Sequence, residues 1–90
     1  MSNIEHELVE TLCVIQGREW TGLDDRAIES LLDLPIADLS LDSLERMEFV
    51  MQIEERYGID LDERDVIACK FLRQYAELIR RQIHRADGRV

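Results

Sequence analysis

The stretch from Leu39 to Leu61 reads LSLDSLERMEFVMQIEERYGIDL and predicts a helix that follows a loop. Asp42 and Ser43 are both typical helix N-caps, and a glycine follows Tyr57 as a natural helix end. We therefore expect the helix to begin at Asp42 or Ser43 and to run to about Tyr57. The 3.6-residue period gives this helix an apolar side, expected to be buried, and a polar side. The apolar side comprises Leu44, Met47, Val50, Met51 and Ile53, and the polar side Glu45, Glu48, Glu54 and Glu55.

Two helices are expected upstream of this one. Residues 3–16 place apolar side chains at a helical period, and Ser2 and Glu5 have the spacing of a capping box. Residues 24–33 predict a short accessory helix, which ends before Pro35 because the residue preceding proline avoids helical geometry. The segment after Pro35 is expected to be a loop.

Downstream of the central helix we expect an extended connector, a short helical turn at residues 63–67, and a last helix over residues 70–84. Residues 85–90 are expected to form a frayed tail. The sequence thus predicts an all-α fold and one domain over residues 1–84, a bundle of three principal helices plus one or two short ones, with a long first loop.

Length and charge exclude several functions. The chain has 90 residues and a formal net charge of −9, from 20 acidic and 11 basic residues. Because nucleic acids and anionic membranes attract Lys and Arg, neither is an expected partner, and a basic protein surface is favoured. We expect neither enzymatic activity nor a metal site, since no catalytic or metal-binding motif is present and a chain this short has little room for a substrate cleft.

Features of cellular location are few. No apolar run approaches the length of a membrane span, and the N-terminus lacks the basic and apolar regions of a signal peptide. Cys13 and Cys69 lie far apart in the chain, and we expect both to be small buried hydrophobic residues in a reducing compartment. These features predict a cytoplasmic protein.

One position stands out chemically. Ser43 is expected to be exposed at the start of a helix, where the helix dipole favours a phosphate group. The alternative is that this serine only caps the helix, as many serines do. Position alone does not decide between a functional serine and a structural one.

The wider string around Ser43 closely resembles the acyl carrier protein family. The matching elements are, in order and without a gap from Leu39 to Asp65, a D-S-L tripeptide, a glutamate four residues past its leucine, a hydrophobic stretch ending in V-M, an E-E pair, an aromatic-Gly-Ile turn and an acidic patch. The resemblance implies that Ser43 carries a 4′-phosphopantetheine arm, attached by a separate phosphopantetheinyl transferase. It also implies that the arm holds acyl groups as thioesters.

The resemblance further implies a docking face on the central helix. Acidic residues there would meet basic patches around the active sites of acyl-loading ligases or transferases and of synthases. The matched positions are acidic Asp42, Glu45, Glu48, Glu54 and Glu55 and apolar Leu44 and Met47. The alternative for the glutamates is an ordinary solvated helix face. Four further apolar residues belong to the core or line a cavity for the acyl chain: Met51, Ile53, Phe71 and Leu72.

The sequence departs from the family at several positions. Ser40 stands where the family often has glycine, and Asp62 where it often has proline. These departures spare the serine site. As departures from the usual family pattern, they leave the pathway open among fatty-acid, polyketide and related secondary-metabolite biosynthesis. Two alternatives also stay open: a stand-alone aminoacyl or peptidyl carrier, and an acidic interaction module without a prosthetic group. The family resemblance implies a monomer.

Overall fold

The computed structural model describes residues 4–17 and 24–87, and in this part of the chain the regular structure is helical. The helices, in chain order, are α1 (Ile4–Gln16), α2 (Asp25–Leu32), a short 3₁₀ helix η1 (Ile36–Leu39), α3 (Ser43–Tyr57), α4 (Glu63–Ala68) and α5 (Leu72–Asp87). The all-α prediction is confirmed. Among the helices described, none combines the length and the apolar character that crossing a membrane requires.

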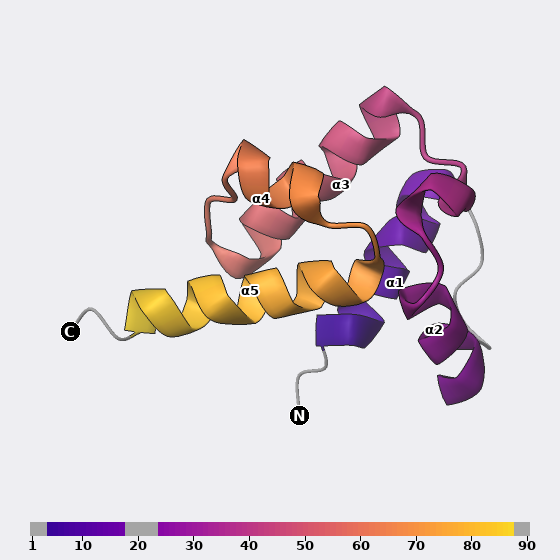
Figure 1. The fold of residues 1–90 in the computed structure, drawn as a ribbon, viewed down its shortest axis with the longest axis horizontal. Helices are drawn as coiled ribbons and strands as arrows, with labels where there is room; N and C mark the ends of the chain where they lie inside the picture. Colours follow the sequence, from indigo (N-terminus) through magenta and orange to yellow (C-terminus); the bar gives the residue numbers. More distant parts are fainter. Residues whose placement is uncertain (1–3, 18–23, 88–90) are drawn as a thin grey trace.

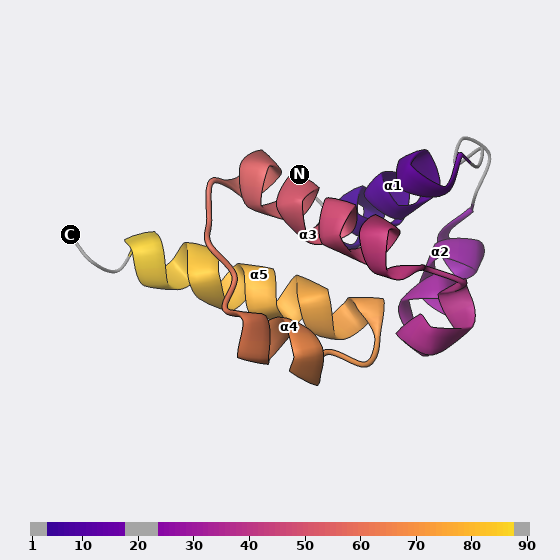
Figure 2. The same cartoon turned by 90° about the horizontal axis from the view of Figure 1, so that it is seen from above.

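The long helices α1, α3 and α5 surround the core (Figure 1). The short helix α2 packs against α1 and against the start of α5, at one end of the bundle. Seen from above, α4 lies along α5, on the side away from α1 (Figure 2). In both views the C-terminal end of α5 projects beyond the other helices.

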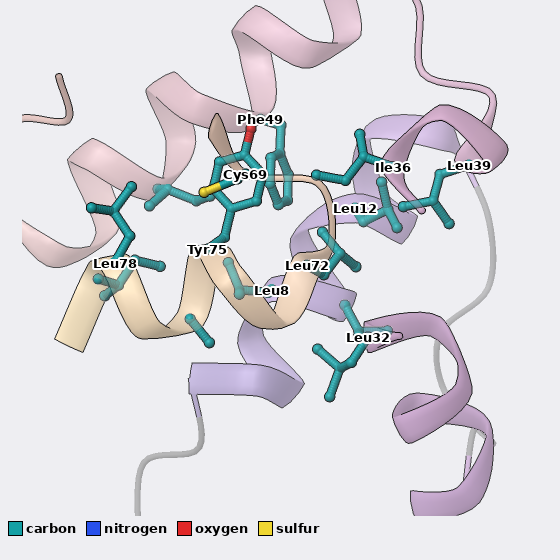
Figure 3. Packing of buried hydrophobic residues seen from close by; sticks show 14 of the residues in the cluster. Leu8, Leu12, Leu32, Ile36, Leu39, Phe49, Cys69, Leu72, Tyr75 and Leu78 are labelled. Atoms are coloured by element: carbon teal, nitrogen blue, oxygen red, sulfur yellow. The ribbon is translucent and has the colours of Figure 1, made fainter. Parts of the chain in front are cut away.

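Aromatic and aliphatic side chains from every long helix meet in the core (Figure 3). The rings of Phe49 on α3 and Tyr75 on α5 pack edge to face, with 5.4 Å between their centroids and an interplanar angle of 89°. Leu8 and Leu12 of α1 are buried beside them, and Leu32 brings α2 into the same cluster. Both cysteines are free and buried, as predicted.

The predicted buried side of the central helix is wrong for three of its five residues. Leu44, Met47 and Met51 are 64%, 61% and 59% exposed, and the buried residues of α3 are Phe49 and Ile53. The error arises because α3 has apolar residues on two faces. A periodic pattern shows which residues share a face, but it does not show which apolar face meets the core.

Several helix ends differ from prediction. Residues 36–39 were expected to be a loop and form η1 instead. The last helix begins at Leu72 and continues to Asp87, so residues 85–87 of the expected tail are helical. This extension is reasonable because no glycine or proline interrupts the sequence before Gly88. Residues 88–90, and Ser2 of the predicted capping box, lie outside the described part of the chain.

Two contacts join the segment before α3 to the start of α5. The Arg73 guanidinium pairs with Asp33 at 2.7 Å and also with Glu29, which ties α2 to α5. Next to this pair, Pro35 and Phe71 form an isolated β-bridge, and the Ile36 N–H donates to the Lys70 carbonyl at 2.8 Å. The segment that precedes α3 is therefore attached, through residues 29–36, to the chain at the start of α5.

Candidate functional site

The N-terminus of α3 is closed by a capping box. The Asp42 carboxylate accepts a hydrogen bond from the Glu45 N–H at 2.7 Å, and the Glu45 carboxylate accepts one from the Asp42 N–H at 3.2 Å. Asp42 is thus the N-cap, and Ser43 is the first helical residue. Since Asp42 performs the capping, the exposed Ser43 side chain is not needed for it. The structural alternative for Ser43 is thereby weakened.

Burial of one residue and a hydrogen bond from α1 fix the turn that leads into α3. Leu39 is buried, and its carbonyl accepts a hydrogen bond from the Gln16 side chain at 2.6 Å. Ser40 then takes a left-handed conformation, with φ of 59° and ψ of 32°. This is the conformation that glycine adopts without steric cost, and it explains why a glycine suits this position in the family. The turn directs the chain outward, so that α3 begins at the surface.

A groove of about 470 Å³ lies between α3 and α4, and Ser43 is one of its lining residues. Most of the lining is apolar, from Met47, Val50, Met51, Leu61, Val66 and Ile67. The polar lining residues besides Ser43 are Arg46, Glu54 and Glu63. The site therefore combines an exposed hydroxyl with an apolar recess next to it.

The predicted docking residues fall into two groups. Asp42, Leu44, Met47, Glu48 and Glu55 are exposed on α3. The spacing of residues 44, 48, 51 and 55 places them along one stripe of the helix.

The other two predicted glutamates have structural partners. Glu45 completes the capping box, and the Glu54 carboxylate accepts a hydrogen bond from the Leu61 N–H at 2.8 Å. Both are partly buried. Their side chains are therefore less available to a partner than those of Glu48 and Glu55.

Of the four residues predicted to belong to the core or to a cavity, only Met51 lines the groove. Ile53 and Leu72 are buried in the core, and Phe71 is partly buried at the bridge with Pro35. The sequence did not identify the other lining residues as parts of a groove, Arg46 and Ile67 among them. Arg46 had a signal, because a residue three positions after Ser43 shares its helix face. Ile67 had none, since the placement of α4 depends on tertiary packing.

Two titratable side chains lie in the core near α3 and α4. Burial raises the pKa of the Tyr75 hydroxyl, and the nearby Arg46 guanidinium opposes this shift. Burial also raises the pKa of the Cys69 thiol, which donates a hydrogen bond to the Asp65 carbonyl at 3.3 Å. Both groups are therefore neutral at physiological pH, as their position in an apolar core requires.

Comparison with known proteins gives the class of this chain. Residues 18–79 match the family described as "Phosphopantetheine attachment site". Because the match covers more than half of the chain, the chain belongs to this family, that of the acyl carrier proteins, and the predicted relationship is confirmed. Membership implies a covalently attached 4′-phosphopantetheine.

Individual relatives agree with this assignment. The chain is 32% identical over 82 residues to acyl carrier protein 1 of Casuarina glauca, a chloroplastic protein, covering 91% of this chain and 59% of the relative. It thus spans little more than half of that protein. It is also 29% identical over 72 residues to the acyl carrier protein of Rickettsia bellii (strain RML369-C), covering 78% of this chain and 74% of the relative.

Solved structures share the fold. The oxytetracycline acyl carrier protein superposes with a TM-score of 0.71 at 24% identity, over 96% of this chain and 86% of that one. The acetyl actinorhodin acyl carrier protein of Streptomyces coelicolor gives a TM-score of 0.68 at 27% identity, over 96% and 94% of the two chains. The helical arrangement is therefore that of acyl carrier proteins.

The residues present fit the prosthetic group. Ser43 offers an exposed hydroxyl at a helix N-terminus, where a phosphate anion is electrostatically favoured. The adjacent groove offers apolar surface for a carried chain. Nothing in the capping box has to move for the hydroxyl to be modified, because the box uses Asp42 and Glu45 only.

Proposed function

We propose that this protein is a carrier of acyl groups, held as thioesters on a 4′-phosphopantetheine arm attached to Ser43. One observation carries this proposal: the exposed Ser43 is the first residue of α3 and lies beside the apolar groove. The thiol of the bound arm supplies the thioester chemistry. The chain itself supplies a rigid attachment point and a surface that partner enzymes recognise.

The attachment step belongs to a separate transferase. In it the Ser43 oxygen forms a bond to the phosphorus that carries pantetheine in coenzyme A. The phosphoanhydride bond breaks, adenosine 3′,5′-bisphosphate leaves, and the serine proton passes to a base of the transferase. The N-terminus of α3 then stabilises the phosphodiester anion left on Ser43.

The exposed stripe of α3 is the proposed docking face. It presents apolar Leu44 together with acidic Glu48 and Glu55, and the exposed Met47 and Asp42 lie beside it. A face on which acidic side chains alternate with apolar ones fits basic patches around the active sites of loading ligases, transferases and synthases. Charge complementarity of this kind raises the association rate and sets orientation more than affinity. This suits a carrier that leaves after each step.

The pathway that the carrier serves lies among fatty-acid, polyketide and related secondary-metabolite biosynthesis. We propose that the chain is a shuttle rather than a catalyst, since its site offers an attachment point without an assembled acid, base and nucleophile. A bare interaction module would present the same acidic face. Covalent modification of Ser43 distinguishes the two functions.

Intact-protein mass spectrometry tests the proposal. Wild type and Ser43→Ala are incubated with coenzyme A, magnesium and a phosphopantetheinyl transferase of broad specificity. Ser40→Ala serves as the matched control, because this serine lies three residues upstream on the same surface. We expect a mass gain of one phosphopantetheine in wild type and Ser40→Ala, and none in Ser43→Ala.

A gain in Ser43→Ala would show that the attachment residue is wrong. If folded wild type shows no gain, the carrier function fails and the acidic interaction module becomes the better account. Circular dichroism confirms that each variant is folded, and Ser43→Ala is expected to lose at most about 1 kcal/mol of stability, since Asp42 provides the cap.

A further inference from the structure

An arginine without a carboxylate partner among the described residues lines the groove beside Ser43. Two described arginines are partly buried, Arg46 and Arg73. Arg73 pairs with carboxylates on α2, whereas Arg46 has no carboxylate within 4.0 Å among the residues that the structure describes. The guanidinium of Arg46 therefore keeps hydrogen-bond donors available at the groove wall.

A second polar group near Arg46 makes no hydrogen bond of normal geometry among the described residues. Tyr75 is 1% exposed and reaches from α5 toward α3 beside Phe49 (Figure 3). Its hydroxyl makes no hydrogen bond of normal geometry to any described residue, but the Arg46 guanidinium lies close enough to act as a weak hydrogen-bond donor to it and lowers its pKa against the effect of burial. A buried hydroxyl whose hydrogen bonding is this incomplete is rare and calls for an explanation.

An unsubstituted alkyl chain fits poorly against the side of the groove that Arg46 forms. Such a chain would cover Arg46 and remove water from the guanidinium without replacing the lost hydrogen bonds. Burial of an unpaired charge is costly, so this desolvation opposes the gain from the apolar lining. A carried chain with an acceptor oxygen next to Arg46 would bind the same apolar surface and also accept a hydrogen bond from the guanidinium.

The remaining polar lining limits the kind of oxygen. Glu54 and Glu63 also face the groove, and the whole chain carries a formal charge of −9. A carboxylate on the carried chain would meet repulsion from both glutamates. A neutral ketone or hydroxyl oxygen meets none.

We propose that the groove between α3 and α4 is selective for acyl chains that carry a neutral acceptor oxygen, held by Arg46 with the Tyr75 hydroxyl behind it. This inference rests on the proposed attachment of the arm to Ser43 and deepens it by naming the class of carried group. Arg46 is then a specificity-determining residue of the carrier.

The experiment compares four chains on the same arm. The transferase loads the protein with coenzyme A analogues bearing hexanoyl, 3-oxohexanoyl, 5-oxohexanoyl or adipoyl groups through hydrolysis-resistant amide links, and mass spectrometry verifies each load. Thermal unfolding then gives Tm for each form. In wild type we expect at least one oxohexanoyl form to exceed the Tm of the hexanoyl form by about 6 °C or more, as a hydrogen bond to a charged group in a small domain predicts.

Variants locate the effect. Arg46→Met keeps an unbranched apolar side chain without a donor and should abolish the advantage of the oxo chain, and Arg46→Leu replaces it if Arg46→Met does not fold. Arg64→Met is the matched control: Arg64 is exposed on α4 and outside the groove, so the wild-type order should persist. Tyr75→Phe should fold, since the hydroxyl makes no hydrogen bond of normal geometry to a described residue, and should reduce the advantage. The ¹⁵Nε resonance of Arg46 should shift with the oxo chain and not with hexanoyl.

The outcomes separate the two proposals. Failure of wild type to load any analogue refutes the carrier function, and the selectivity falls with it. Loaded protein with equal Tm for hexanoyl and both oxo chains refutes the selectivity alone, as does an oxo advantage that survives when Arg46 is replaced by methionine or leucine. A highest Tm for the adipoyl form would show that the groove selects an anion and overturn the neutral class.

Discussion

Three residues at the start of α3 have different roles in the site. Asp42 caps the helix, Ser43 presents a hydroxyl, and Arg46 faces the groove. The sequence predicted the first two roles, because caps follow local rules. It did not predict the third, since an arginine on a helix is usually solvated and only the position of α4 places this one at a groove.

Ser40 carries a conformational cost that a substitution can remove. A non-glycine residue in the left-handed region is disfavoured by about 1 kcal/mol or more, while glycine loses part of this gain through its larger unfolded-state entropy. Ser40→Gly is therefore expected to raise the free energy of unfolding by about 0.5 kcal/mol. Urea denaturation measures it. Ser30→Gly, inside α2, should lower stability instead, and a loss in Ser40→Gly would contradict the strain argument.

Asp42 allows capping to be separated from docking. Asp42→Asn keeps a good N-cap but removes the charge, whereas Asp42→Ala removes both. We expect Asp42→Asn to be nearly as stable as wild type and Asp42→Ala to lose about 1 kcal/mol. If docking uses the charge, both variants should raise the KM of the transferase for the apo protein. Equal KM values for all three proteins would show that this aspartate acts only as a cap.

At the scale of elements, ion pairs tie the ends of α1 and α2 to α5. Glu5 on α1 and Arg80 on α5 form a two-pronged pair, with both distances at 2.6 Å. Arg73 pairs with Asp33 and Glu29 from α2. The sequence indicated each helix but not these pairs, because residues 75 positions apart have no local signal that brings them together.

The Glu5–Arg80 pair predicts a dependence of stability on pH. The guanidinium lowers the pKa of Glu5 below its ordinary value of 4.5. A lowered pKa in the folded state means that the stabilisation is complete above pH 4.5 and is lost as the pH falls through the folded value. We expect Glu5→Gln to cost up to about 1 kcal/mol at pH 7 and progressively less below pH 4.5. In an Arg80→Gln background this pH dependence should become smaller, because the remaining causes of the lowered Glu5 pKa are weaker than Arg80.

The ion pairs of Arg73 with Asp33 and Glu29, here called the Arg73 clamp, predict that their loss loosens α2 and not the whole fold. Arg73→Gln removes both ion pairs that join α2 and its C-cap Asp33 to α5, while the buried Ile28 and Leu32 still hold that helix to the core. We expect faster amide hydrogen exchange in α2 and unchanged exchange in α3. The Asp33 pKa, lowered by Arg73, should return toward its ordinary value in the variant. Equal loosening of all helices would show that the clamp stabilises the whole fold.

At the scale of the whole molecule, charge is unevenly distributed. Residues 24–66 hold 14 acidic and four basic residues, whereas residues 70–90 hold two acidic and six basic ones. The sequence showed this asymmetry directly, since charge needs no fold to be counted. The bundle was also predicted correctly, because helical periods and glycine ends are local. The groove was not, since it results from the way α3 and α4 pack.

The acidic face predicts association that depends on salt and on position. Glu48→Lys should raise the KM for the transferase several-fold at low salt, with a smaller effect at about 0.5 M salt because of screening. Glu77→Lys reverses an exposed charge on α5, away from the proposed docking face, and should have little effect. Similar effects from both variants would indicate that net charge, rather than the α3 face, governs docking.

The projecting end of α5 has a practical consequence. This end lies on the opposite side of the molecule from the start of α3 (Figure 1). A dye, a surface linker or a neighbouring domain joined beyond α5 would therefore leave the serine end facing solution. The carrier suits immobilisation from that side, and a bead or sensor chip that holds it there should present the loaded arm to passing enzymes without blocking their approach.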